Sequence, residues 1–173
     1  QMAWKEKGSR SVAPTFIAHG LVDSTSGMIA IQSGAVGHNL AVVSACATGT
    51  HALGEAAEAI KRGDVTAVIA GSTENPLLEV AHIGFMNMRG LGAPRAGEGP
   101  ATASRPYDKD RAGFVLGEGS GAFIVEDLAT ATARGATIYA EVVGYGSSAD
   151  AHDMIQPIEG GAGSARSVKW ALQ

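Results

Sequence analysis

The chain is organised around Ala41-Val42-Val43-Ser44-Ala45-Cys46-Ala47-Thr48-Gly49, a stretch that carries its only cysteine. An apolar, β-branched run bounded by turn residues predicts a short buried strand over Leu40–Ala45. The alanine-rich run that follows, from Ala47 to Gly63, predicts a helix, since alanine is the best helix former. Gly63 supplies a left-handed stop at the end of that helix. The sequence therefore places Cys46 at the joint between a strand and a helix.

This position has a chemical consequence for Cys46. A thiol at a helix N-terminus faces backbone N–H groups that lack intrahelical partners and the positive end of the helix dipole. Both favour the thiolate over the thiol, which makes the sulfur a better nucleophile at neutral pH. The same N–H groups can stabilise an oxyanion on an attacked carbonyl. A lone cysteine is more often a small core residue, so position alone leaves the structural interpretation open.

The rest of the chain alternates between apolar runs and turn signals. Asp64–Gly71 predicts a second buried strand, which would complete a parallel strand–helix–strand unit. Leu77–Met88 is compatible with either a helix or an irregular segment. We expect the remaining elements to be a helix over Pro14–Gly34, a loop over Gly90–Thr102, a strand over Ala122–Val125, a helix over Glu126–Gly135 and a long strand over Ala136–Gly146.

Composition narrows the class of protein. The 173 residues are 45% hydrophobic but only 5% aromatic, with 24 glycines, which indicates a core of small and branched side chains. A net charge of -4 without a basic stripe argues against nucleic acid as a partner. One cysteine excludes an internal disulfide and fits a reducing cytoplasm. Without an apolar run of about 18 residues or a signal-peptide pattern, we expect no membrane association.

Other candidate chemistry is weak. His51 follows Cys46 by five residues, about 140° around a helix, so it should anchor the helix to a neighbour rather than face the sulfur. The histidines lack metal-ligand spacing and the chain has no cysteine pair, so no metal is expected. The glycines of Gly117–Gly121 lead into an apolar strand rather than a helix, which excludes a dinucleotide-binding loop. Neither His38, in a turn, nor His152, in a polar loop, is assigned a catalytic role.

Three blocks together resemble one family. Ser44–Ala52, Ala103–Gly119 and Ile138–Gly146 are similar, in order and spacing, to motifs of the β-ketoacyl-acyl-carrier-protein synthases of type II fatty-acid synthesis. The resemblance implies an α/β fold of the thiolase type, in which two similar halves form an αβαβα layering. Residues 1–135 would hold the later part of the first half and residues 136–173 the beginning of the second. Because family members are longer, we expect the chain to be the central portion of a synthase.

The resemblance also implies a reaction. Cys46 would accept an acyl group from an acyl carrier protein, and decarboxylation of malonyl-carrier protein would supply the carbanion that lengthens it. Phe85 matches an aromatic residue that lines the acyl pocket, and Phe16 a position that reaches the acyl pocket of the second subunit of a homodimer. No cofactor is implied. The family's later histidine motifs, of His-Gly-Thr and Gly-His-Asn type, do not occur in this sequence.

Alternatives remain at this stage. The chain could be a scaffold or dimerisation piece without turnover, or part of a polyketide ketosynthase. A thiolase or chalcone-synthase-like enzyme shares the fold and the cysteine, but the continuation Ala47-Thr48-Gly49-Thr50-His51 is closer to the elongating bacterial ketosynthases. An inactive chain-length factor would lack the cysteine, so Cys46 argues against it.

Overall fold

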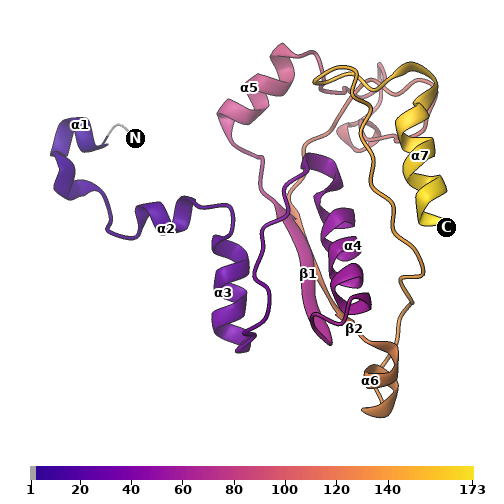
Figure 1. Ribbon diagram of the computed structural model, residues 1–173. Coiled ribbons are helices and arrows are strands. Elements are labelled where there is room, and N and C mark those ends of the chain that lie inside the picture. Colours follow the sequence, from indigo (N-terminus) through magenta and orange to yellow (C-terminus); the bar gives the residue numbers. More distant parts are fainter. Residues whose placement is uncertain (1–2) are drawn as a thin grey trace.

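A computed structural model describes residues 3–173 (Figure 1). Its centre is one long helix, α4 (Thr48–Lys61), lying on a two-stranded antiparallel sheet of β1 (Ala67–Glu74) and β2 (Gly119–Glu126). The other helices are α1 (Ala3–Lys7), α2 (Phe16–Gly20), α3 (Ser24–Ser33), α5 (Glu79–Asn87), α6 (Leu128–Ala133) and α7 (Ala162–Ala171). Figure 1 shows α1, α2 and α3 extending to one side of the sheet.

The centre is built from small residues. Along α4 the buried positions are Gly54, Ala56, Ala57 and Ala59, and Ala70 of β1 is also buried. Between the strands, Gly71 faces Gly121 and Ala122 so closely that an added Cβ would collide with the backbone of β2. Such short side chains let the helix approach the sheet, as the many glycines and few aromatic residues predict.

The helix predicted around the cysteine is confirmed almost to the residue. Its end also matches, because Gly63 adopts a φ of 78°, which suits glycine. The strand predicted at Asp64–Gly71 exists as β1, but it starts and ends about three residues later. β2 contains the whole of the strand predicted at Ala122–Val125, and α6 lies inside the helix predicted at Glu126–Gly135.

Two strand predictions are wrong for this structure. Neither Leu40–Ala45 nor Ala136–Gly146 belongs to a strand, and β1 pairs antiparallel with β2 instead of parallel with the first of these segments. A strand exists only where a neighbour accepts and donates its backbone hydrogen bonds. Among residues 3–173 neither segment has such a neighbour, although both carry the apolar pattern of one.

The single helix predicted for Pro14–Gly34 is also wrong. The structure divides it into α2, ending at Gly20, and α3, beginning at Ser24. Leu21 between them has extended backbone, with φ −77° and ψ 144°, and the Ser24 hydroxyl donates to the Ala18 carbonyl across the break. Gly20, unusual inside a helical pattern, marks the point of the break.

The charged segment after the Gly90–Thr102 loop is held by one arginine. Arg105 donates to the carbonyl oxygens of Asp110 at 2.9 Å, Ala93 at 3.0 Å and Thr102 at 2.9 Å. Asp108 pairs with Arg95 at 2.9 Å. A run of charges that composition alone assigns to a solvated face therefore ties together a loop preceding β2.

Much apolar surface remains uncovered. The chain exposes 13623 Å², whereas a compact protein of its 17.5 kDa mass exposes about 7,900 Å². Large side chains on α2, α3 and the segment before α4 are among the exposed ones, for example Ile31 at 78% and Leu40 at 70%. These residues alone therefore do not bury the apolar side chains of the fold.

Candidate active site

Cys46 lies in a tight turn directly before α4. A 3-10 turn spans Ala45–Ala47, and Ser44 precedes it with φ −147° and ψ 38°. Ala45 has a φ of 51°, in the left-handed region that non-glycine residues avoid at a cost of about 1–2 kcal/mol. The chain reverses sharply here, and the turn presents Cys46 to solvent.

A pocket of about 360 Å³ opens at the sulfur. It lies where the start of α4 meets the two strands, and it is lined by Cys46, Gly49, Thr50, Leu53, Gly71, Ser72, Gly121 and Phe123. Its walls are small or apolar, with two hydroxyl groups. Such a site suits an acyl chain with a carbonyl at one end, and glycines on three elements leave the space for it.

The helix start at this pocket is uncapped. No side chain accepts a hydrogen bond from the first amides of α4, although Thr48 Oγ1 accepts one from the Ser44 N–H at 3.0 Å. The first N–H groups of a helix have no intrahelical acceptor, and the dipole is positive there. The Thr48 N–H at this helix start donates to the Ala45 carbonyl, and Cys46 lies in the turn that makes this contact, directly before α4 as the sequence predicts.

His51, also on α4, is not among the residues that line this pocket. Its Nδ1 is 2.6 Å from Ser44 Oγ and its Nε2 is 3.1 Å from Ser147 Oγ. The prediction that His51 anchors the helix to a neighbour is confirmed. The segment it holds was not assigned to the site from the sequence, because Ser147 lies 96 residues away.

Tyr145 packs beside that histidine. The two rings meet edge to face with centroids 6.2 Å apart, and Gly54 of α4 leaves the room that Tyr145 occupies. Burial, followed by the nearby Glu55 carboxylate, raises the pKa of Tyr145 above its ordinary value, so its hydroxyl stays protonated and donates to Glu55 at 3.4 Å. The conspicuous sequence signal for this contact is the glycine inside α4.

The two predicted acyl-contacting aromatics lie elsewhere. Phe85, on α5, is half-buried and packs edge to face on Phe114 with centroids 6.0 Å apart. Phe16, on α2, is 56% exposed. Neither is among the residues that line the pocket at Cys46, so the structure brings together Cys46, β1 and β2 but not the aromatics.

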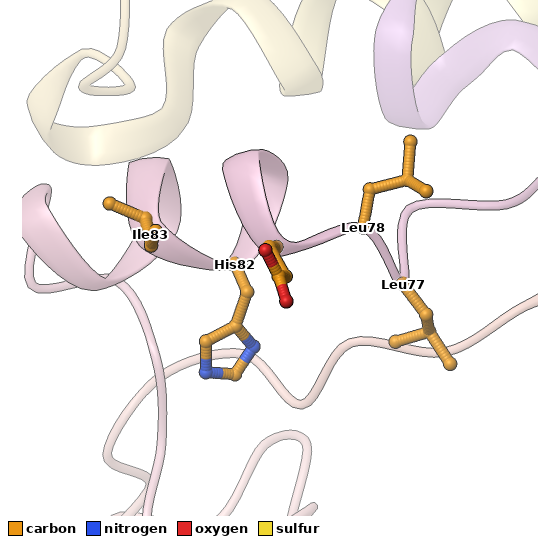
Figure 2. Close-up of a pocket in the computed structure, with 5 residues that line it drawn as sticks. Leu77, Leu78, His82 and Ile83 are labelled. Atoms are coloured by element: carbon orange, nitrogen blue, oxygen red, sulfur yellow. The ribbon is translucent and has the colours of Figure 1, made fainter.

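A second, more open depression of about 380 Å³ lies at the start of α5. Figure 2 shows Leu78 pointing away from Leu77 and His82. The side chains that line this depression are mostly aliphatic, and its polar groups are Glu79 and His82. Within residues 3–173, no cluster of metal-ligating side chains occurs, and no helix is both long and apolar enough to cross a membrane.

Comparison with known proteins explains this arrangement. Residues 1–131 match the family model of the beta-ketoacyl synthase N-terminal domain. The chain belongs to this family. It is 43% identical over 169 residues to a 3-oxoacyl-[acyl-carrier-protein] synthase 2 of Rhizobium meliloti, covering 98% of this chain but 40% of that protein. The chain thus spans well under half the length of this beta-ketoacyl synthase relative.

Solved structures give the same fold. A beta-ketoacyl synthase from Burkholderia phymatum superposes with a TM-score of 0.86 at 32% identity, over 98% of this chain and 41% of that one. A type II polyketide ketosynthase, in complex with its acyl carrier protein and bound to the hexaketide, superposes with a TM-score of 0.89 at 32% identity, over 95% and 40%. The fold is the α/β fold of the thiolase-like ketosynthases, present in part.

Proposed function

We propose that this chain supplies the nucleophile of a β-ketoacyl-acyl-carrier-protein synthase that elongates fatty acids. The observation that carries the proposal is Cys46, exposed at an uncapped helix start and opening onto a pocket of small and apolar residues. Acyl transfer needs a nucleophile and space for an apolar chain, and this corner of the fold offers both.

The reaction proceeds in two stages. The Cys46 thiolate attacks the carbonyl carbon of an acyl thioester, the new C–S bond forms, and the carrier's thiolate leaves and takes a proton. Malonyl thioester then loses CO2, and the electron pair of the broken C–C bond becomes a carbanion. That carbanion attacks the acyl-Cys46 carbonyl, the C–S bond breaks, and the chain is two carbons longer while Cys46 is restored.

Sequence identity favours a role in fatty-acid elongation over a role in polyketide synthesis. The chain is 43% identical to a 3-oxoacyl-[acyl-carrier-protein] synthase 2 but 32% identical to the type II polyketide ketosynthase. The reacting groups are the same in both pathways, so the difference lies in the acyl chain accepted. Comparing saturated acyl-carrier protein with a β-polyketide thioester as donors to Cys46 distinguishes the two, and we expect faster transfer from the saturated donor.

We further propose roles for the two aromatics and a boundary within the chain. Phe85 would contact the acyl chain beyond Cys46, since its ring is half-buried against Phe114 in the segment leading to β2. Phe16, exposed on α2, would contact the acyl chain of a second subunit. The first thiolase-like half would end near Gly135, which follows α6 and has a φ of 69°. Residues 136–173 would begin the second half.

The partners we propose follow from the chemistry of the substrate. An acyl carrier protein, loaded first with acyl and then with malonyl, would deliver both thioesters, as the structure of the polyketide ketosynthase with its own carrier protein supports. A second copy of the chain would cover the apolar surface around Leu40. The cytoplasm, where carrier-bound thioesters are made, fits a protein with a single free cysteine.

The decisive experiment replaces the nucleophile in the full-length protein that contains this chain. We expect Cys46→Ser to abolish transfer of a radiolabelled acyl group from acyl-carrier protein without lowering the melting temperature, because a hydroxyl of nearly the same size stays un-ionised. Mass spectrometry of the acyl adduct gives the site. Transfer at a comparable rate by the serine variant would refute the assignment.

The rival function is a scaffold without turnover. It predicts that Cys46 reacts with iodoacetamide no faster than free cysteine does. Because Cys46 is the only cysteine of these 173 residues, total alkylation of the purified chain reports on it alone. We expect a faster reaction, since the turn before α4 exposes Cys46 beside a pocket.

A further inference from the structure

The turn that carries Cys46 is held by hydrogen bonds of Ser44, the residue directly before the turn. The Ser44 N–H donates to Thr48 Oγ1 at 3.0 Å, its carbonyl accepts from the Ala47 N–H at 3.1 Å, and its hydroxyl meets His51 Nδ1 at 2.6 Å. Strained backbone persists only where surrounding contacts determine it. The left-handed conformation of Ala45 is therefore held largely through Ser44, and of the residues that bond Ser44, His51 is the one that also contacts a distant part of the chain.

The other nitrogen of His51 leads to a distant part of the chain. Nε2 lies 3.1 Å from the hydroxyl of Ser147. A neutral imidazole has one N–H and one acceptor nitrogen, and each serine hydroxyl can serve as either donor or acceptor. The chain Ser147–His51–Ser44 is thus complete with the ring neutral, and both nitrogens are engaged. Neither nitrogen is therefore left to take a proton from Cys46.

The segment containing Ser147 is itself wedged between two helices. Tyr145 fills the space beside Gly54 of α4, whereas Gly144 and Gly146 press against the carbonyl oxygens of Ala171 and Ser167 on α7. Side chains of an extended chain alternate in direction, so the same three residues face α4 on one side and α7 on the other. A shift of this segment would move Ser147 and, through His51, the turn at Ser44.

We propose that His51 is a positioning residue, which transmits the placement of the Gly144–Ser147 segment to the Cys46 turn through hydrogen bonds to Ser147 and Ser44. The reactivity of the nucleophile then depends on the docking of residues from the beginning of the second half. This inference rests on the proposed role of Cys46 as nucleophile and adds to it a residue that never touches substrate.

The test compares His51→Ala, Ser147→Ala and the double variant in the full-length protein. Readouts are iodoacetamide alkylation of Cys46, acyl transfer from acyl-carrier protein, and melting temperature. His38→Ala is the matched control, an exposed histidine eight residues before Cys46. We expect both single variants to slow acyl transfer about 10-fold to 100-fold, since small misplacements of reacting groups have effects of that size. The double variant should be no slower than His51→Ala, because the two residues act through one path.

A conservative variant separates the two contacts. In His51→Asn the amide can replace Nδ1 toward Ser44 but is too short to reach Ser147, so we expect it to behave like Ser147→Ala. Ser147 is exposed, so its truncation should not unfold the protein even where His51→Ala does. Unchanged acylation and alkylation in Ser147→Ala, or additive losses in the double variant, would overturn the proposal. Acyl transfer that survives Cys46→Ser would instead refute the proposed function, so the two failures are distinguishable.

Discussion

At the scale of single residues, the site depends on one strained backbone position. Ala45 holds a φ of 51° one residue before the nucleophile. A β-branched residue is disfavoured there more strongly than alanine, while glycine adopts such a φ freely. The short side chain of Ala45 therefore keeps a turn that larger residues would open.

We expect Ala45→Val to lower the free energy of unfolding by about 1–2 kcal/mol, and to slow iodoacetamide alkylation of Cys46, because the turn relaxes toward extended backbone. Ala45→Gly is the control, since it fits the same conformation and should alkylate at the rate of the unchanged protein. Thermal melting followed by circular dichroism and timed alkylation measure the two effects. Equal alkylation rates in the valine and glycine variants would show that the strain does not position the sulfur.

The sequence alone predicts that Cys46 lies directly before a helix, but it does not predict the backbone conformation of the turn that exposes it. A lone cysteine before an alanine-rich run marks a helix start, and that inference needs only local propensity. The φ of Ala45 does not follow from local propensity, because alanine prefers other backbone regions. Ser147 was missed for a related reason, since nothing local links a serine to a histidine 96 residues earlier.

At the scale of elements, α6 has the clearest local cause. The Asp127 carboxylate accepts from the Thr130 N–H at 3.0 Å, which satisfies one free amide at the helix start. That backbone hydrogen bond, followed by one from the Thr130 hydroxyl, holds the pKa of Asp127 below its ordinary value of 3.8. A carboxylate with a lowered pKa in the folded state stabilises it above the ordinary pKa, and this stabilisation is lost as pH falls through the folded-state value.

We therefore expect Asp127→Ala to lower the melting temperature at pH 7, with the difference from the unchanged protein shrinking below pH 4 as Asp127 becomes protonated. Asp127→Asn is the matched variant, because asparagine also caps helices but does not titrate in this range. At pH 7 the melting temperature of Asp127→Asn should fall less than that of Asp127→Ala. A difference between Asp127→Ala and the unchanged protein that stays constant from pH 7 to pH 3 would contradict this account.

Helices were predicted better than strands, and the reason is physical. Caps, glycine stops and alanine runs act within a few residues, so α4 and α6 follow from their own sequences. A strand needs a partner, and Leu40–Ala45 and Ala136–Gly146 carry strand patterns without a hydrogen-bonded neighbour in the described residues. Their apolar composition is consistent with neighbours that this chain does not contribute.

At the scale of the whole molecule, exposed apolar side chains leave a surface that another polypeptide segment can cover. Leu40 and Val43 are each 70% exposed on a segment whose backbone belongs to no sheet. An extended apolar edge pairs readily with another chain, and pairing with its own copy about a two-fold axis covers both edges at once.

We expect the full-length protein to be a homodimer through Leu40–Ala45. Val43→Lys should shift it toward monomer, because a charge placed in an apolar interface opposes association. Met154→Lys, at a residue that is 97% exposed outside this segment, is the control and should remain dimeric. Sedimentation at micromolar concentration measures the state. A full-length protein that sediments as a monomer with undiminished activity would contradict the prediction.

The 173-residue chain by itself contains the nucleophile and its turn. Its pocket at Cys46 is lined by small, apolar and hydroxyl side chains, with no histidine or other cationic group among them, and both nitrogens of His51 contact serine hydroxyls. Decarboxylation needs donors at the developing enolate, and loss of a single such donor typically slows catalysis about 10²–10³-fold. Thiol reactivity is different, because the helix start and the Ser44 turn lie within the chain.

We therefore expect the purified chain to be acylated slowly and to release no CO2 above the uncatalysed background when mixed with acyl- and malonyl-carrier proteins. Its exposed apolar surface makes aggregation a competing outcome, so size-exclusion chromatography should precede the assay. The Cys46→Ala chain is the control, and should show neither acylation nor CO2 release. CO2 release from the unchanged chain that disappears in Cys46→Ala would mean that a complete decarboxylation site lies within these residues.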